Sequence, residues 1–192
     1  MNRLATELVG SLNAAVLLAF GRQAGMRLFE TADREEASVA ARSFFAAAIS
    51  LPAFVCLHLL DWIAAGPPAH AAREFTLDLA GYGLYWAGYA VLSHAIVAAI
   101  GRADLWPRYI TAWNWCNVVQ YLLVTAAALP ILIGLPGWIA QAAGLIAMGW
   151  AFWLEWFITR TALETGPISA AALTCIDVFA GMFVFGGLEM IT

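Results

Sequence analysis

Six polar residues lie within stretches that otherwise suit only a lipid bilayer, and their side chains could bind a polar solute or carry protons. They are Asp177, Glu155, His94, Asn114, Asn117 and Gln120. An ionisable group inside a membrane-spanning helix costs about 2.5–3.5 kcal/mol on insertion scales and usually faces the interior of the bundle. His94, Glu155 and Asp177 each share a helical face with small residues, where membrane helices approach one another. We therefore expect all three to point into the bundle.

The amides Asn114, Asn117 and Gln120 fall within one arc of a single helix. Two interpretations of the six polar residues stay open. In the first, they bond to one another across helices, each bond contributing about 0.6 kcal/mol on average. In the second, they line a cytoplasm-facing cavity that binds a small polar solute or passes protons, with Asp177 as the titrating group at its bottom.

Other chemistries have little support. The three histidines show no HxxxH or HExxH spacing, and no GxSxG or Walker sequence occurs, so we predict no metal site, no cofactor and no enzymatic activity. Cys56, Cys116 and Cys175 each lie in a hydrophobic segment, and we expect them to be buried small apolar residues. No basic cluster with interleaved aromatic residues indicates nucleic-acid binding.

Composition predicts the fold class. Hydrophobic residues make up 63% of the 192 residues and charged residues 11%, with a mean hydropathy of +0.80. A soluble domain is about 45–50% apolar and about 25% charged, so the surplus apolar surface must face lipid. We predict an all-α polytopic membrane helix bundle.

Five segments are long and apolar enough to cross a bilayer, which needs about 20 residues. They form one transmembrane bundle over residues 43–192 and cover 43–60, 75–100, 109–134, 137–158 and 167–191. Residues 1–42 form a cytoplasmic and interfacial region before it. Within that region Leu4, Leu8, Leu12, Val16 and Phe20 recur every four residues, which predicts an amphipathic helix lying in the membrane interface.

Arginine placement predicts the orientation. All nine basic residues are arginine, and the five-span topology puts eight of them on the side of the N-terminus and Arg73 alone on the other. Since positive charge is retained in the cytoplasm, the N-terminus is expected inside and the C-terminus in the periplasm of a bacterial inner membrane.

Two features carry a resemblance to known proteins. The five-span topology with an amphipathic start resembles that of Yip1-domain membrane proteins, without a DLYGP-like signature. The segments "GRQAGMRLFE" and "ARSFFAAAISLP" look like those of small polytopic inner-membrane proteins of alphaproteobacteria. The resemblance implies a role in membrane organisation and supplies no catalytic residues.

The preferred function is that of a structural or accessory protein, which contacts membrane lipids and either other membrane subunits or copies of itself. The alternative is a small transporter or proton-linked permease with its site around Asp177.

Overall fold

The computed structural model describes residues 3–29 and 36–189, and every regular element in them is helical. The helices are α1 (Arg3–Ala19), α2 (Ala24–Arg27), α3 (Glu36–Ser43), α4 (Phe45–Ala65), α5 (Ala71–Ala99), η1 (Ala103–Leu105), α6 (Trp106–Ala128), η2 (Leu129–Ile131), α7 (Gly137–Ala162) and α8 (Pro167–Glu189). The predicted all-α class is therefore confirmed.

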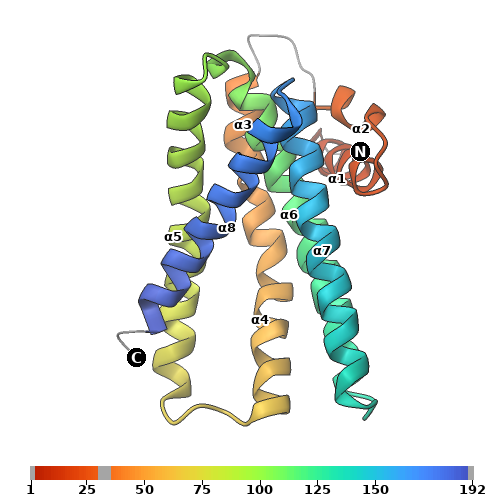
Figure 1. Cartoon of the computed structure of the whole chain (residues 1–192), viewed down its shortest axis with the longest axis vertical. Helices are drawn as coiled ribbons and strands as arrows, with labels where there is room; N and C mark the ends of the chain where they lie inside the picture. The colour runs from red at the N-terminus through yellow and green to blue at the C-terminus, as the bar shows by residue number, and fades with distance from the viewer. Residues whose placement is uncertain (1–2, 30–35, 190–192) are drawn as a thin grey trace.

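The long helices α4 to α7 run up and down along the long axis of the molecule, and α8 slants across them (Figure 1). Helix α6 lies at the centre, where it packs against α1, α3, α4, α5 and α7, while α8 packs against α5 and α7. All ten residues from Tyr109 to Val118 are buried, whereas none from 119 to 128 is fully buried. The core therefore occupies the half of the bundle where the N-terminal helices pack.

Three helices are long and apolar enough to cross a membrane, namely those over residues 37–65, 137–162 and 167–188. The first joins α3 and α4, which are separated only at Phe44. Within the described residues, α5 and α6 are not among the helices that meet both requirements of length and apolar composition. The expectation of a helical protein suited to a membrane is therefore supported, and the count of five spans stays a prediction.

The helix ends differ from those expected. The expected spans 43–60 and 75–100 leave residues 61–74 as the first connection. In the structure α4 continues to Ala65 and α5 begins at Ala71. Helix α6 ends at Ala128 instead of 134, because Pro130 lacks the N–H that the next helical turn would need. Helix α7 extends four residues beyond the expected 158, and the expected end of the last span at 191 lies outside the described residues.

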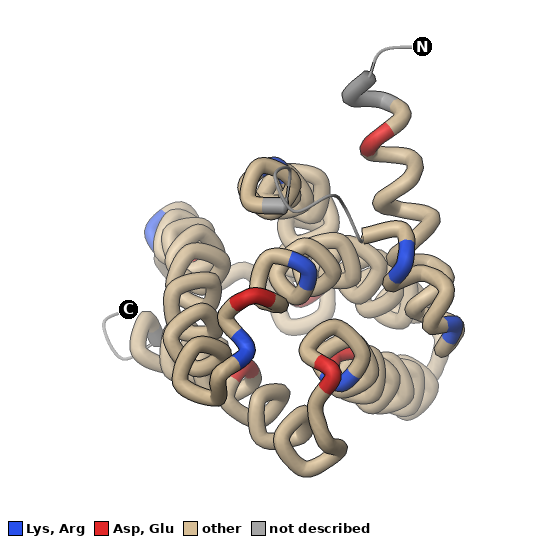
Figure 2. Tube along the Cα trace, turned by 90° about the horizontal axis from the view of Figure 1, so that it is seen from above, with Lys and Arg blue, Asp and Glu red and all other residues tan. Residues whose placement is uncertain are grey.

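Helix α1 lies crosswise to the long axis, near the end of the bundle that carries the α5–α6 and α7–α8 connections (Figures 1 and 2). The apolar residues expected on one face of α1 differ in their burial. Leu8 and Leu12 pack against the protein core, while Val16 and Phe20 are exposed, with Phe20 at 78%. The side chain of Leu4 lies outside the described part. The face that docks on α6 and α7 consists mainly of small residues and Leu18, which allow the helix backbones to approach closely.

Helix α2 folds back on α1 at Gly25, and this contact yields a prediction. A Cβ at Gly25 would lie 2.5 Å from the carbonyl oxygen of Ala14 and 2.9 Å from Leu18, whereas a Cβ at Gly10 would meet nothing within 4 Å. We expect Gly25→Ala to lower the free energy of unfolding by about 1–3 kcal/mol, the usual cost of overpacking. The control Gly10→Ala should be neutral or stabilising by up to about 1 kcal/mol, because alanine favours an exposed helix. Unfolding of the detergent-solubilised protein measures both, and equal effects would contradict the α1–α2 packing.

Candidate functional site

The best-defined polar cluster surrounds the carboxyl group of Asp177 on α8. This residue is 2% exposed, and each of its two oxygens accepts a hydrogen bond from a different helix. The Tyr85 hydroxyl of α5 donates to Oδ1 at 2.6 Å, and the Trp113 indole Nε1 of α6 donates to Oδ2 at 2.8 Å. Three helices thus meet at one carboxylate.

Glu155 of α7 faces Asp177 and brings a fourth helix to the cluster. Its side chain is buried, and its carboxyl group lies close enough to that of Asp177 for the two to interact electrostatically. Two adjacent negative charges are strongly disfavoured away from water. We call Glu155 and Asp177 the acid pair. The Oε1 atom of Glu155 is buried and has no hydrogen-bond partner.

Aromatic rings enclose the acid pair on the side of α5 and α6. Trp113 packs against Tyr89, Trp86 and Tyr85, with ring centroids 4.6, 5.2 and 6.0 Å away. The hydroxyl groups of Tyr89 and Tyr109 bond to each other in the same buried region. The carboxyl group of Asp177 is thus held by polar atoms on the rims of otherwise apolar rings, a common arrangement for buried tyrosine and tryptophan.

The three predicted amides are interior but bond away from the acid pair. Asn114 donates to Ser43 Oγ of α3 at 2.6 Å, and Asn117 donates to the Trp113 carbonyl of its own helix at 3.0 Å. Gln120 donates to the Ala151 carbonyl of α7 at 3.3 Å. The structure therefore brings Asp177 and Glu155 together. Asn114 and Gln120 form separate links from α6 to its neighbours, and Asn117 bonds within α6.

The expected inward orientation of His94 is wrong. His94 is exposed and packs edge-on against Trp106, with centroids 4.9 Å apart. The small residues that share its face, Gly83, Ala87 and Ala98, are exposed as well. Helix α5 instead turns its aromatic face inward, since that face buries more apolar area and its tyrosine hydroxyls find partners. The buried residues of this face include Tyr82, Trp86, Tyr89, Ser93 and Val97.

Tyr85 and Tyr89 are the site residues that the sequence reasoning missed. Their signal was the recurrence of aromatic residues at positions 82, 85, 86 and 89, which is helical spacing, but it resembles ordinary core packing. Trp113, by contrast, directly precedes Asn114, the first of the predicted amides, in the sequence.

Arg108 joins the beginning of α6 to the end of α7. It donates through Nε to the Ala162 carbonyl of α7 at 3.0 Å and through Nη2 to Glu164 at 2.9 Å. The hydrogen bond and positive charge of Arg108 lower the pKa of the exposed Glu164 carboxyl. The beginning of α6 is thereby fixed to the turn between α7 and α8.

The potential metal ligands are dispersed. Within residues 3–29 and 36–189, no group of three or more His, Cys, Asp or Glu side chains could hold a metal ion. Cys116 is buried as expected, Cys56 is half-buried, and Cys175 is exposed, contrary to expectation.

The fold and the cluster define the chain as an all-helical protein with helices suited to a membrane and a polar centre at the junction of α5, α6, α7 and α8. No protein-family model, curated protein or solved structure matches it. The likeness to Yip1-domain proteins thus stays a hypothesis.

A double-mutant cycle tests whether the Asp177–Tyr85 contact joins α8 to α5. We expect Asp177→Ala and Tyr85→Phe to be coupled by about 1 kcal/mol in the free energy of unfolding, since polar contacts between membrane helices range from about 0.6 to 1.7 kcal/mol. The control cycle pairs Asp177→Ala with Ser43→Ala, which removes the separate Asn114 contact and should show no coupling. Equal coupling in both cycles would refute a direct contact. Detergent unfolding titrations provide the measurement.

Proposed function

We propose that the chain is an integral protein of a bacterial inner membrane that crosses the bilayer five times and acts as a structural or accessory component of a membrane assembly. The observation that carries this proposal is that Asp177 and the predicted amides are hydrogen-bonded to groups of the protein, most of them on neighbouring helices. Both oxygens of Asp177 are occupied by donors of the protein, and the predicted amides have acceptors on α3, α6 and α7.

Helices α5 and α6 have the length required of two further spans. Their 29 and 23 residues correspond to about 43 Å and about 34 Å, against a hydrocarbon core of about 30 Å. The polar residues that lower the hydropathy of α6, such as Asn114 and Asn117, are buried and would not meet lipid. The charged residues of α5, namely Arg73, Glu74 and Asp78, lie within its first eight residues, near one end of the helix.

Arginine positions support a cytoplasmic location for the end of the bundle with the N-terminal helices. Arg22, Arg27, Arg42, Arg102, Arg108 and Arg160 belong to the segments at that end, and Arg73 belongs to the other. This distribution supports a periplasmic end for α8 by the positive-inside rule.

Exposed faces of the bundle suit contact with other membrane helices. The half of the bundle distant from α1 carries large exposed apolar side chains, including Ile133, Trp138 and Phe183. On α5, the exposed face with Gly83, Ala87 and Ala98 would allow a neighbouring helix to approach closely.

Native extraction tests the accessory role. We expect the 20.6 kDa chain, extracted in a mild detergent, to migrate as part of a larger assembly of constant stoichiometry. Gly83→Leu should release it, because the added side chain would occupy the small-residue face. Gly149→Leu on α7 is the matched control, since a Cβ at either glycine meets nothing within 4 Å. A wild-type chain that migrates alone would eliminate the accessory role.

A second candidate function is proton-linked transport through the acid pair, favoured by the unpartnered Oε1 of the buried Glu155. The Tyr85 ring lines an apolar groove of about 510 Å³ between α5 and α8, while its hydroxyl holds Asp177. Rotation of this one side chain would open the carboxyl group to the groove.

Proton flux distinguishes the two functions. The wild-type protein and the variants Asp177→Asn and Glu155→Gln are reconstituted in vesicles that contain a pH-sensitive dye. The transport function requires proton flux in the wild-type protein and a loss of about tenfold or more in both variants. The reason is that the amide groups of the introduced Asn and Gln do not release a proton near neutral pH. The accessory role predicts no flux above protein-free vesicles in any of them.

A further inference from the structure

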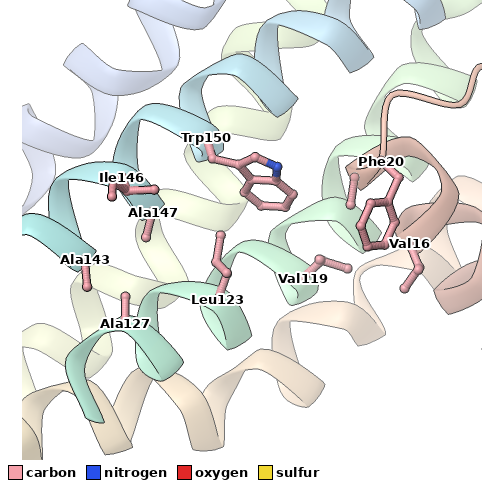
Figure 3. A pocket seen from close by; sticks show the side chains of 10 residues that line it. Val16, Phe20, Val119, Leu123, Ala127, Ala143, Ile146, Ala147 and Trp150 are labelled. Carbon is pink, nitrogen blue, oxygen red and sulfur yellow. The ribbon is translucent and has the colours of Figure 1, made fainter. Parts of the chain in front are cut away.

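A deep apolar groove lies between the crosswise helix α1 and the long helices α6 and α7 (Figure 3). Its volume is about 580 Å³, within the range of ligand-binding pockets. All ten lining side chains are apolar, and they include Phe20 of α1, Val119 and Ala127 of α6, and Ala143 and Trp150 of α7. Apart from the indole N–H of Trp150, such a lining offers no side-chain hydrogen-bonding group and suits a hydrocarbon chain.

The length of the groove corresponds to one leaflet of a bilayer. On α6 it extends from Val119 to Ala127, a distance of eight helical steps or about 12 Å, compared with about 15 Å for half of the hydrocarbon core. Helix α1 crosses one end of the groove, which we call its upper end because it lies toward the top of Figure 1. Val16 and Phe20 contribute to the lining there, at the right of Figure 3. A transmembrane helix of a partner would need about 30 Å and would collide with α1, whereas a lipid chain ends at this level.

The upper mouth of the groove carries positive charge. Gly21 approaches the ring of Trp153, one turn beyond Trp150 on α7, and a Cβ at Gly21 would lie 3.3 Å from that ring. The next residue, Arg22, is exposed, and Arg27 of α2 is exposed as well. Residues 8–29 contain no acidic residue. An anionic headgroup at this mouth would therefore meet a cation next to the ring contact between α1 and α7.

We propose that this groove binds one acyl chain of an anionic phospholipid of the cytoplasmic leaflet, with the phosphate group near Arg22. The inference rests on the proposed membrane orientation, in which α1 lies at the cytoplasmic surface. The bound chain fills the space beneath α1 and adds apolar contact between α1, α6 and α7. The lipid thus fastens the N-terminal helix to the bundle.

Photochemical labelling tests the site. The full chain is placed in bilayer discs that contain a phosphatidylglycerol with a diazirine on its acyl chain, and the labelled peptides are identified by mass spectrometry. We expect adducts to concentrate on groove residues of α6 and α7. Ala143→Phe fills the groove and should reduce these adducts about tenfold, while Ala142→Phe, exposed on the same helix outside the groove, should not. Ala127→Phe fills the groove from α6 and repeats the test if Ala143→Phe fails to fold.

Headgroup recognition is measured in the same discs by competition between unlabelled phosphatidylglycerol and phosphatidylcholine with identical chains. Arg22→Gln should weaken the preference for phosphatidylglycerol about fivefold, the effect of one cation near a charged surface. Adducts spread evenly over the outer faces of α4, α5 and α8, unaltered by Ala143→Phe, would overturn the site while leaving membrane insertion intact. A chain that is not inserted would give no adducts on those faces either. Loss of an oligomer in Ala143→Phe, without loss of lipid adducts, would assign the groove to a second protein copy.

Discussion

The packing of the bundle depends on the carboxyl group of Asp177. It is the point at which α8 is joined to α5 through Tyr85 and to α6 through Trp113, while Glu155 brings α7 to the same place. In an apolar surrounding, surface burial alone does little to choose between rotations of one helix about its axis, because lipid tails are as apolar as leucine. A carboxyl group that accepts hydrogen bonds from two donors favours one rotation of its helix over the others. The slanted path of α8 across the other helices brings Asp177 within reach of donors on α5 and α6 (Figure 1).

Helix α6 has the complementary role of a central axis. Over one stretch of ten residues every side chain is buried, and the polar ones among them each have an acceptor on α6 itself or on a neighbouring helix. Farther along, Gln120 and Thr125 extend these links to α7 and α4. Amides in the middle of a helix are costly against lipid, and α6 is surrounded by α1, α3, α4, α5 and α7.

Much of the architecture could be predicted from composition and helical period, and the reasons for the remainder are physical. The interior position of Asp177, Glu155 and the three amides followed from the cost of exposing such groups to lipid. His94 was misplaced because α5 has two possible inner faces, one of small residues and one of aromatic residues, and periodicity defines faces without selecting between them. The donors to Asp177 could not be identified, since Tyr85 and Trp113 are separated from it by 92 and 64 residues. Helix ends were displaced where a local feature such as Pro130 ended the helix before the apolar run did.

The crosswise position of α1 has a consequence for how the protein is made. Helix α1 is synthesised before α7, yet its docking surface includes Trp150 and Ala147, which follow more than a hundred residues later. At about 5–20 residues per second, this delay is on the order of ten seconds. During that interval Leu18 and the other apolar side chains of α1 lack the partners on α7 that cover them in the folded protein. An apolar surface such as that of a bilayer would shield them until α7 arrives.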